Sequence, residues 1–309
     1  MAKNKPGRAV IFLVFRLVSF LVLVLPARIA LLLGQVFGSL CFYILKKERK
    51  KALENLDIAF KDSKARTEKR NIVKKVFENL GKNFIEVISI PKLNSSYIKR
   101  YVSCKNIGML RQLLQEGKAV IILSAHFGNW ELLAHYLSIM GMPMNVIARR
   151  VRQSGLEAFL IRIRKKNGVN VLYRDASAKE VVDLLKNKKF VGIMPDQDMD
   201  SVSGVFVDFF DRLAWTPSGP AVLNFLTSAA IVPCFIVRRE FGHEVLIEKP
   251  IELVKTEDRR KDILENTQRY TRAIENHVRE FPDHWVWFHD RWKTEPVVPN
   301  GTGTGQARK

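Results

Sequence analysis

Cysteine is scarce in this chain of 309 residues, and acidic side chains are outnumbered by basic ones. The three cysteines are Cys41, Cys104 and Cys234, and no two of them form a C-x2-C pair. Their spacing therefore indicates neither a zinc site nor a disulfide framework, and it is typical of a protein in a reducing compartment.

The shortage of acidic residues leaves a strongly basic protein. Asp and Glu number 31 against 51 Lys and Arg, so the formal net charge is +20. Such a field favours anionic partners: phospholipid head groups, a phosphorylated glycolipid, an acidic carrier protein or nucleic acid. No recognisable nucleic-acid-binding motif is present, and we therefore expect no nucleic-acid partner. A merely soluble basic surface explains the charge less well, because apolar sequence adjoins the basic clusters.

Apolar sequence is concentrated at the amino terminus. Residues 9–25 and 29–45 are apolar runs separated by Pro26, and 17 helical residues measure about 26 Å, which just crosses a bilayer core. Basic residues flank the unit at both ends: Lys3, Lys5 and Arg8 before it, and Lys46, Lys47, Arg49, Lys50 and Lys51 after it. This distribution favours a shallow hairpin or interfacial anchor over one clean span. The apolar sequence also continues past any plausible cleavage point, which argues against a signal peptide.

Four regions follow from the pattern along the chain. We expect residues 1–45 to be a membrane anchor, 46–103 a helical connector packed on the core, 104–296 an α/β domain, and 297–309 a disordered tail. Within the connector, apolar residues recur at helical spacing under a Lys-rich face, at Phe77, Leu80, Phe84, Val87 and Ile88. This spacing predicts an amphipathic packing helix without a site.

The third region alternates short apolar strands with helices. Strands are predicted over residues 120–123, 144–148, 169–173 and 190–194, with helices over 153–166 and 178–188 between them. Such βαβα alternation predicts an α/β fold, a mostly parallel sheet covered by helices. Further on, residues 231–239 and 244–253 indicate a strand pair, and residues 258–280 a long charged helix.

The stretch AVIILSAHFGNWELL, residues 119–133, joins a buried strand to a polar turn and a helix. His126 follows the strand, Asn129 can cap the helix, and Glu131 falls in its first turn. Ligands of open α/β sheets bind outside the carboxyl ends of the strands. A carboxylate that holds one imidazole nitrogen leaves the other free to take a proton, so His126 and Glu131 form a candidate catalytic pair. The plain alternative is a turn histidine beside a carboxylate that stabilises the helix dipole.

Each of the next three strands also ends in polar residues. Arg149, Arg174 and the pair Asp196 and Asp198 follow these strands, and parallel neighbours would bring them to the edge where His126 lies. Arg149 is a candidate phosphate ligand or a solvated arginine. The two aspartates invite a metal, but no other ligand cluster is visible, so we expect no metal; Asp196 instead could orient Arg149 or Arg174.

Two aromatic segments near the carboxyl terminus have open interpretations. The run from Gly204 to Phe210 is either a turn and strand that lines an acyl groove or simple core. The cluster of Trp285, Trp287, Phe288 and Trp292 is expected to pack the carboxyl-terminal element rather than bind a ligand.

Several motifs together resemble the late acyltransferases of lipid A synthesis, within the glycerolipid acyltransferases marked by H-x4-D/E. They run in family order across nearly the whole chain: NLDIAF at 55–60, HFGNWE at 126–131, ARR at 148–150, PDQD at 195–198, GVFVDFF at 204–210 and WVWFHDRWKT at 285–294. Two positions depart from the family pattern. Arg150 stands where proline is usual, and Asp290 where a basic residue is usual; both bear on the acceptor more than on the reaction.

The resemblance implies transfer of a fatty acyl group from an acyl carrier protein thioester to a hydroxyl of a membrane glycolipid, a lipid A precursor. In this interpretation His126 is the general base, assisted by Glu131, and no acyl-enzyme or cofactor is required. The residues expected to contact substrate are Asn129, Arg149, Arg174, Asp196 and Asp198. The implied location is the inner membrane, among membrane lipids, with the catalytic domain on the cytoplasmic side.

Two alternatives remain at this stage. The same mechanism could act on another glycolipid or a lysophospholipid, such as a mannosylated phosphoinositide, with acyl-coenzyme A as donor. The chain could also be a non-catalytic basic protein that binds membrane surfaces or nucleic acid, although the ordered motifs argue against it.

Overall fold

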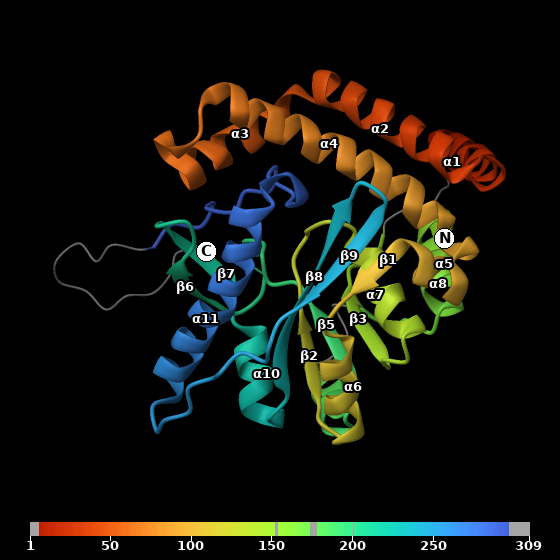
Figure 1. The fold of residues 1–309 in the computed structure, drawn as a ribbon. Coiled ribbons are helices and arrows are strands. Elements are labelled where there is room, and N and C mark those ends of the chain that lie inside the picture. Colours follow the sequence, from red (N-terminus) through yellow and green to blue (C-terminus); the bar gives the residue numbers. More distant parts are fainter. Residues whose placement is uncertain (1–5, 152–153, 174–177, 200, 297–309) are drawn as a thin grey trace.

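The computed structural model describes residues 6–151, 154–173, 178–199 and 201–296. Its strands are β1 (Val102–Cys104), β2 (Val120–Leu123), β3 (Met144–Ala148), β4 (Asn170–Tyr173), β5 (Phe190–Ile193), β6 (Gly204–Asp208), β7 (Leu213–Pro217), β8 (Ala230–Arg239) and β9 (Gly242–Ile247). Seven of them form one sheet in the order β1-β9-β8-β2-β5-β3-β4 (Figure 1). Strands β2, β3, β4, β5 and β8 run parallel, while β9 is antiparallel to β8 and parallel to β1. The predicted α/β class with a mostly parallel sheet is confirmed.

The predicted strands differ from the structure mainly at their ends. Strands β2 and β3 have the predicted bounds, whereas β4 begins one residue later and β5 ends one residue earlier. The strand predicted over 244–253 ends at Ile247. Beyond it the chain still bonds to β8 through Glu248 N and Ile251 N, but Pro250 has no amide hydrogen and the regular ladder stops.

Helices cover both faces of the sheet. They are α5 (Ser95–Tyr101), α6 (Ile107–Gln115), α7 (Trp130–Ile139), α8 (Ser154–Lys166), α9 (Ala178–Lys186), α10 (Gly219–Thr227) and α11 (Arg259–Glu280). Successive side chains of β2 point to opposite faces, so Ile122 packs with α7 and α8 while Ile121 packs with α9, α10 and α11. All four residues of β2 are buried, as their continuous apolar run predicts for a central parallel strand.

Four amino-terminal helices form a layer over one end of the sheet (Figure 1). They are α1 (Pro6–Val24), α2 (Ala27–Ile44), α3 (Lys46–Phe60) and α4 (Arg66–Ser89). Helix α2 lies along α4, and the contact is too close for larger side chains: a Cβ on Gly38 would lie 2.2 Å from the carbonyl oxygen of Phe77, and one on Gly81 2.0 Å from that of Gly34. Gly34 and Gly38, which are four residues apart, therefore mark a close helix crossing within the protein.

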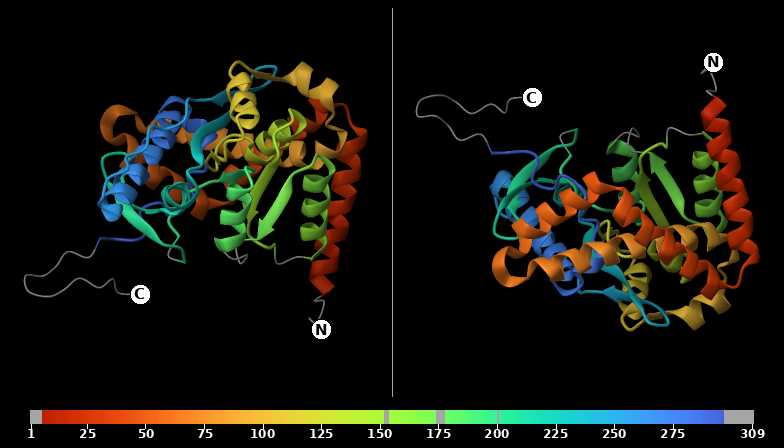
Figure 2. Two further views of the ribbon diagram at one scale, coloured as in Figure 1. Left: turned by 90° about the horizontal axis from the view of Figure 1, so that it is seen from below. Right: turned by 90° about the horizontal axis from the view of Figure 1, so that it is seen from above.

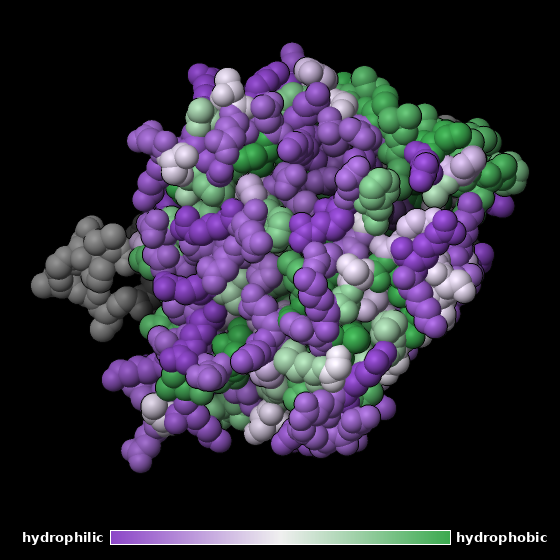
Figure 3. All heavy atoms as spheres, in the orientation of Figure 1, coloured by the Kyte–Doolittle hydropathy of each residue, from purple (hydrophilic) through white to green (hydrophobic). Residues whose placement is uncertain are grey.

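The outer side of this layer is apolar. Large side chains of α1 and α2 are exposed, including Leu17, Phe20, Leu32 and Phe37. Figure 3 shows a hydrophobic area at the upper right, where Figure 1 places these two helices. Helix α1 runs beside α8 (Figure 2), with the rings of Phe15 and Phe159 5.0 Å apart. Helix α2 has the length and apolar composition to cross a membrane.

The carboxyl-terminal segment crosses the end of the sheet and belongs to the core. Trp285 and Trp287 are fully buried, in agreement with their predicted packing role. The β6–β7 ribbon packs beside them, with the ring of Phe209 5.6 Å from that of Trp285. Val207, Phe209 and Phe210 are buried, as the core interpretation of residues 204–210 predicts, and the acyl-groove interpretation stays a prediction. The predicted tail, residues 297–309, lies outside the described residues.

Candidate active site

His126 lies just beyond the carboxyl end of β2, beside the neighbouring strand β5. The ladder pairs Leu123 with Ile193, and Ser124 N continues it by donating to the carbonyl oxygen of Ile193 at 3.0 Å. His126 and Asp196 each follow their paired strand residue by three positions. Strand pairing therefore places these two residues at the same edge of the sheet.

Asp196 holds the imidazole of His126. Its Oδ1 atom lies 2.9 Å from Nδ1 of His126, and its Oδ2 atom accepts the backbone N–H of His126 and the indole N–H of Trp285, both at 2.9 Å. The Asp196 side chain is fully buried, whereas that of His126 is 24% exposed. Burial alone would raise the pKa of Asp196, but His126 and these hydrogen bonds lower it to about 2.

This arrangement determines the tautomer of His126. An ionised carboxylate only accepts hydrogen bonds, so Nδ1 of His126 carries the proton and Nε2 is the basic nitrogen. Burial lowers the pKa of His126, but the charge and hydrogen bond of Asp196, with a smaller contribution from Glu131, raise it above the usual value overall. The imidazole is thus a stronger base than an ordinary histidine and has one nitrogen left for chemistry.

A cavity of about 240 Å³ opens beside this imidazole, between α7 and the sheet. Its lining includes the apolar residues Ile122, Val146, Leu133 and Leu137, and Ser124, Glu131 and Arg164 add polar groups to it besides His126. Gly192 pairs with both Ile122 and Val146 in the ladder, so the missing side chain at this central position contributes to the hollow. The cavity suits a hydrocarbon chain whose reactive end lies at His126.

Glu131 does not hold His126 in this structure. Its carboxylate forms a bidentate ion pair with Arg164 of α8, in which Nε of Arg164 donates to Oε2 at 3.0 Å and Nη2 donates to Oε1. Both side chains line the cavity beside His126. The predicted direct contact between Glu131 and His126 is therefore wrong: Asp196 occupies Nδ1, and Glu131 acts on His126 only through its charge.

Two of the predicted substrate ligands, Asn129 and Asp198, bond to other parts of the protein. Asn129 caps α7, as expected, by accepting the N–H of Leu132 at 3.1 Å, and its Nδ2 donates to Glu86 at 2.7 Å. Asp198 accepts the N–H and hydroxyl of Thr294 at 2.7 and 2.8 Å. Arg149 is exposed and lines the cavity, whereas Arg174 lies outside the described residues.

The two aspartates therefore have separate partners, and the described partners of Asp196 are His126 and Trp285 rather than Arg149. The described residues contain no group of three or more His, Cys, Asp or Glu side chains arranged to hold a metal ion.

Three residues of the site were missed as functional residues in the sequence. Arg164 lies in a basic helix end that offers no local signal. Trp285 was assigned to packing, and it both packs and donates to Asp196. His289 lies with its ring 5.5 Å from that of His126 and its Nε2 2.7 Å from Gln197 Nε2. Burial and the charge of His126 lower the pKa of His289 below its usual value.

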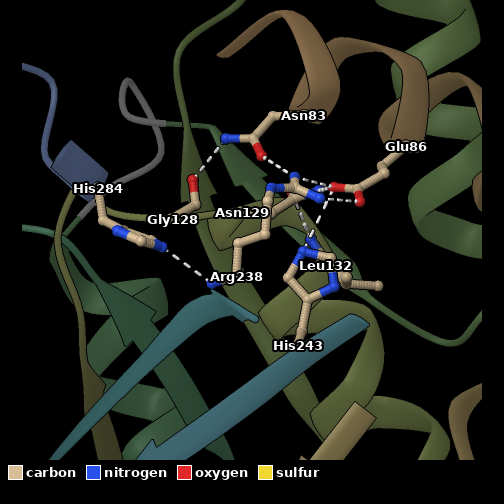
Figure 4. Close-up of polar contacts among 8 residues, drawn as sticks. All are labelled: Asn83, Glu86, Gly128, Asn129, Leu132, Arg238, His243 and His284. Atoms are coloured by element: carbon tan, nitrogen blue, oxygen red, sulfur yellow. Dashed lines mark hydrogen bonds and ion pairs between the residues drawn. The ribbon is translucent and has the colours of Figure 1, made fainter. Parts of the chain in front are cut away.

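A second polar cluster contacts the turn that follows His126 and holds it in place (Figure 4). Arg238 of β8 donates to both carboxylate oxygens of Glu86 at 2.6 and 2.7 Å and to Oδ1 of Asn83 at 2.8 Å. Asn83 in turn donates to the carbonyl oxygen of Gly128 at 2.6 Å. Burial acts to raise the pKa of Glu86, but the neighbouring His243 and Arg238 together keep it far below its usual range. We call these residues with Asn129 the Glu86 network.

The turn itself leaves no freedom at Gly128. Its φ is +56°, and a Cβ at this position would lie 1.8 Å from the carbonyl oxygen of Ile236. Its N–H donates to the carbonyl oxygen of His284 at 2.8 Å. The turn is thus held from α4, from β8 and from the carboxyl-terminal segment.

Comparison with known proteins agrees with this geometry. A model of the bacterial lipid A biosynthesis acyltransferases matches residues 2–294. The chain belongs to this family. It is similar to the lipid A biosynthesis palmitoleoyltransferase of Escherichia coli, at 24% identity over 88% of each chain, and to the lauroyltransferase of the same organism, at 24% over 90% of each.

A further relative is named for a different class of lipid. The phosphatidylinositol mannoside acyltransferase of Mycobacterium tuberculosis is 28% identical over 54% of this chain and 55% of its own. The family and its named members are acyltransferases, and so is this protein. The resemblance seen in the sequence motifs is confirmed. The lipids in the names of both groups of relatives are glycolipids, which supports acyl transfer to a glycolipid.

Proposed function

We propose that this lipid A acyltransferase homologue transfers a fatty acyl group from an acyl carrier protein thioester to a hydroxyl of a lipid A precursor. The observation that carries the proposal is the His126–Asp196 pair at the polar end of an apolar cavity. The acyl chain occupies the cavity, which brings its thioester carbon to His126. Nε2 of His126 removes the proton of the acceptor hydroxyl as its oxygen attacks the thioester carbon.

The tetrahedral intermediate then collapses by expelling the carrier thiolate, which takes up the proton held by the His126 imidazolium. Asp196 keeps the imidazole in its reactive tautomer and stabilises the imidazolium formed during the attack. The hydroxyl of Ser124 lines the cavity and is buried without a hydrogen-bond partner among the described residues, which makes it available to the developing oxyanion. Glu131 and Arg164 fix one wall of the cavity, and Arg149 supplies an exposed positive charge at its edge.

The membrane location rests on the exposed apolar side of α1 and α2. We propose attachment to the inner membrane with the catalytic domain on the cytoplasmic side, where acyl carrier protein resides. The net charge of +20 favours both an acidic carrier and anionic lipid.

The direct test incubates the purified full-length protein with acyl carrier protein or coenzyme A thioesters of defined chain length and a lipid A precursor in detergent. We expect a product heavier by one acyl group with the carrier-bound donor, detected by mass spectrometry. The absence of transfer from both donors would contradict the proposal.

A second acceptor class is favoured by the similarity to phosphatidylinositol mannoside acyltransferases. The same assay with a phosphatidylinositol mannoside tests it. A mass shift of this lipid, with none for the lipid A precursor, would reassign the acceptor and leave the roles of His126 and Asp196 intact.

A further inference from the structure

We propose that a hydrocarbon chain of the acceptor lipid binds in an apolar groove between α4 and the first turn of α7. This inference rests on the proposed function, because it concerns the acceptor of that reaction. The groove encloses about 190 Å³ and is lined by Leu80, Asn83, Phe84 and Val87 of α4 and by Asn129, Trp130 and Glu131. It is separate from the cavity that we assign to the donor chain.

The polar side chains of the groove are all occupied by protein partners. The Asn83 amide bonds to Gly128 and Arg238, that of Asn129 bonds to Glu86 and the N–H of Leu132, and Glu131 pairs with Arg164. Figure 4 shows the Asn83 side chain directed into the Glu86 network. A polar ligand would therefore lose its water without gaining hydrogen bonds here, whereas a hydrocarbon chain needs none.

The apolar lining comes from one stripe of α4. Leu80, Phe84 and Val87 follow each other at spacings of four and three, so they share one side of the helix. Phe84 is 42% exposed, although its helical neighbours Phe77, Ile85 and Ile88 are buried. The sequence predicted this stripe as packing without a site, but part of it faces the groove. Covering it with hydrocarbon removes apolar area from water, which is favourable.

The two ends of the groove indicate which chain it takes. At its outer end, the ring of Phe84 lies 6.4 Å from that of Phe15 in α1, which belongs to the helix pair with the exposed apolar side. At its inner end, Trp130 and Glu131 also line the cavity of His126, and the rings of Trp130 and His126 are 5.3 Å apart. The groove thus joins the lipid-facing surface to the general base.

The reaction has two lipidic substrates, and two apolar hollows meet beside Trp130. The enclosed cavity suits the donor, whose chain must be withdrawn from a soluble carrier. The groove along α4 suits the acceptor, which comes from the membrane and must place its hydroxyl at His126 while its chain stays out of water.

A photolabelling experiment tests occupancy without requiring turnover. The full-length protein is irradiated with dodecyl maltoside that carries a diazirine in its alkyl chain, and labelled residues are mapped by mass spectrometry. We expect label on the peptide that contains residues 80–87, and we expect Phe84→Glu to remove most of it. Phe225→Glu is the matched control, because Phe225 is 38% exposed and lies on α10, at the opposite end of the molecule (Figure 1).

Label confined to the outer surface of α1 and α2, or label on residues 80–87 that persists in the Phe84→Glu protein, would overturn the inference. Because Phe84 is exposed, the substituted protein should fold, and its melting temperature relative to Phe225→Glu checks this.

Kinetics then distinguish the two substrates. We expect Phe84→Glu to raise the KM for the lipid acceptor on the order of tenfold and to leave the KM for the acyl donor unchanged. A raised donor KM instead would mean that the groove holds the donor chain. If wild-type protein transfers acyl groups and Phe84→Glu behaves like Phe225→Glu, the groove inference fails alone. If wild-type protein transfers none, the proposed function fails, and only the photolabelling result bears on the groove.

Discussion

The turn after β2 lies between two clusters of buried charge that differ in one respect. In the first, Asp196 holds one nitrogen of His126 and leaves the other free beside a cavity. In the second, the Glu86 carboxylate receives hydrogen bonds from Arg238 and Asn129 and lies 3.5 Å from His243, so its acceptors are used within the protein. A buried carboxylate therefore marks a reactive site only when its partner retains an unused group that faces a ligand-sized space.

The largest expected loss of activity follows from removing the free imidazole nitrogen of His126. We expect His126→Ala to lower acyl transfer by at least a hundredfold and up to about ten-thousandfold, because general base catalysis contributes in this range. The assay is product formation per folded protein, with circular dichroism as the folding control. Ordinary turnover in a folded His126→Ala protein would remove His126 from the mechanism.

Asp196→Asn should be the next most damaging change and should also move the pH profile. The base must be neutral to act, so activity rises as pH increases through the raised pKa of His126. An amide removes the charge that raises this pKa and can stabilise the wrong tautomer. We therefore expect turnover to fall on the order of a hundredfold or more and the acid limb to shift to lower pH. An unshifted acid limb would separate Asp196 from the titration of His126.

The ion pair at the cavity wall should have a smaller effect. Because Glu131 and Arg164 bond to each other, Glu131→Gln, Arg164→Gln and the double variant should lose similar amounts of activity, on the order of tenfold each rather than a product of two losses. A double-mutant cycle of turnover measures this coupling. Independent, multiplicative losses would indicate that Glu131 acts on His126 or substrate by itself.

The Glu86 network should affect stability more than chemistry. Glu86→Gln leaves Arg238 without its charged partner in a site where both side chains are less than 15% exposed. We expect a loss of about 3 kcal/mol or more in the free energy of unfolding, because a buried charge is then unpaired. Turnover of the protein that remains folded should keep the wild-type pH profile. A shifted acid limb in Glu86→Gln would show that this cluster also tunes His126.

The weakest expected effect concerns the surface charge. Donor use should fall as salt rises, because the Debye length shrinks from about 10 Å at 0.1 M to about 3 Å at 1 M. At equal donor concentrations we expect a steeper fall for the carrier-bound acyl group than for acyl-coenzyme A, since a protein donor touches more basic residues. Equal use of both donors with equal salt slopes would remove the carrier protein from the proposal.

The contacts of the apolar amino-terminal helices could not be predicted from sequence patterns. Their composition and basic flanks were visible, and so was the glycine spacing in residues 29–45. The sequence did not show that Gly34 and Gly38 meet Gly81 and Phe77 of α4, because that contact joins segments about 40 residues apart. The sequence also predicted that the apolar stripe containing Phe84 packs in the core, whereas Phe84 is partly exposed.

Periodicity, turn residues and motif order are local properties of the chain, so the sequence was enough to predict the strands and helices around the site, the turn with His126 and the family. It also indicated that polar strand ends would meet. The carboxylate that holds His126, in contrast, depends on how distant segments pack. Strand order puts β5 beside β2, and this brings Asp196 to Nδ1, while the packing of α8 against α7 draws Glu131 to Arg164. Asp196 lies 70 residues from His126, and Arg164 lies 33 residues from Glu131. Local sequence patterns cannot show such pairings, because they depend on how the core packs.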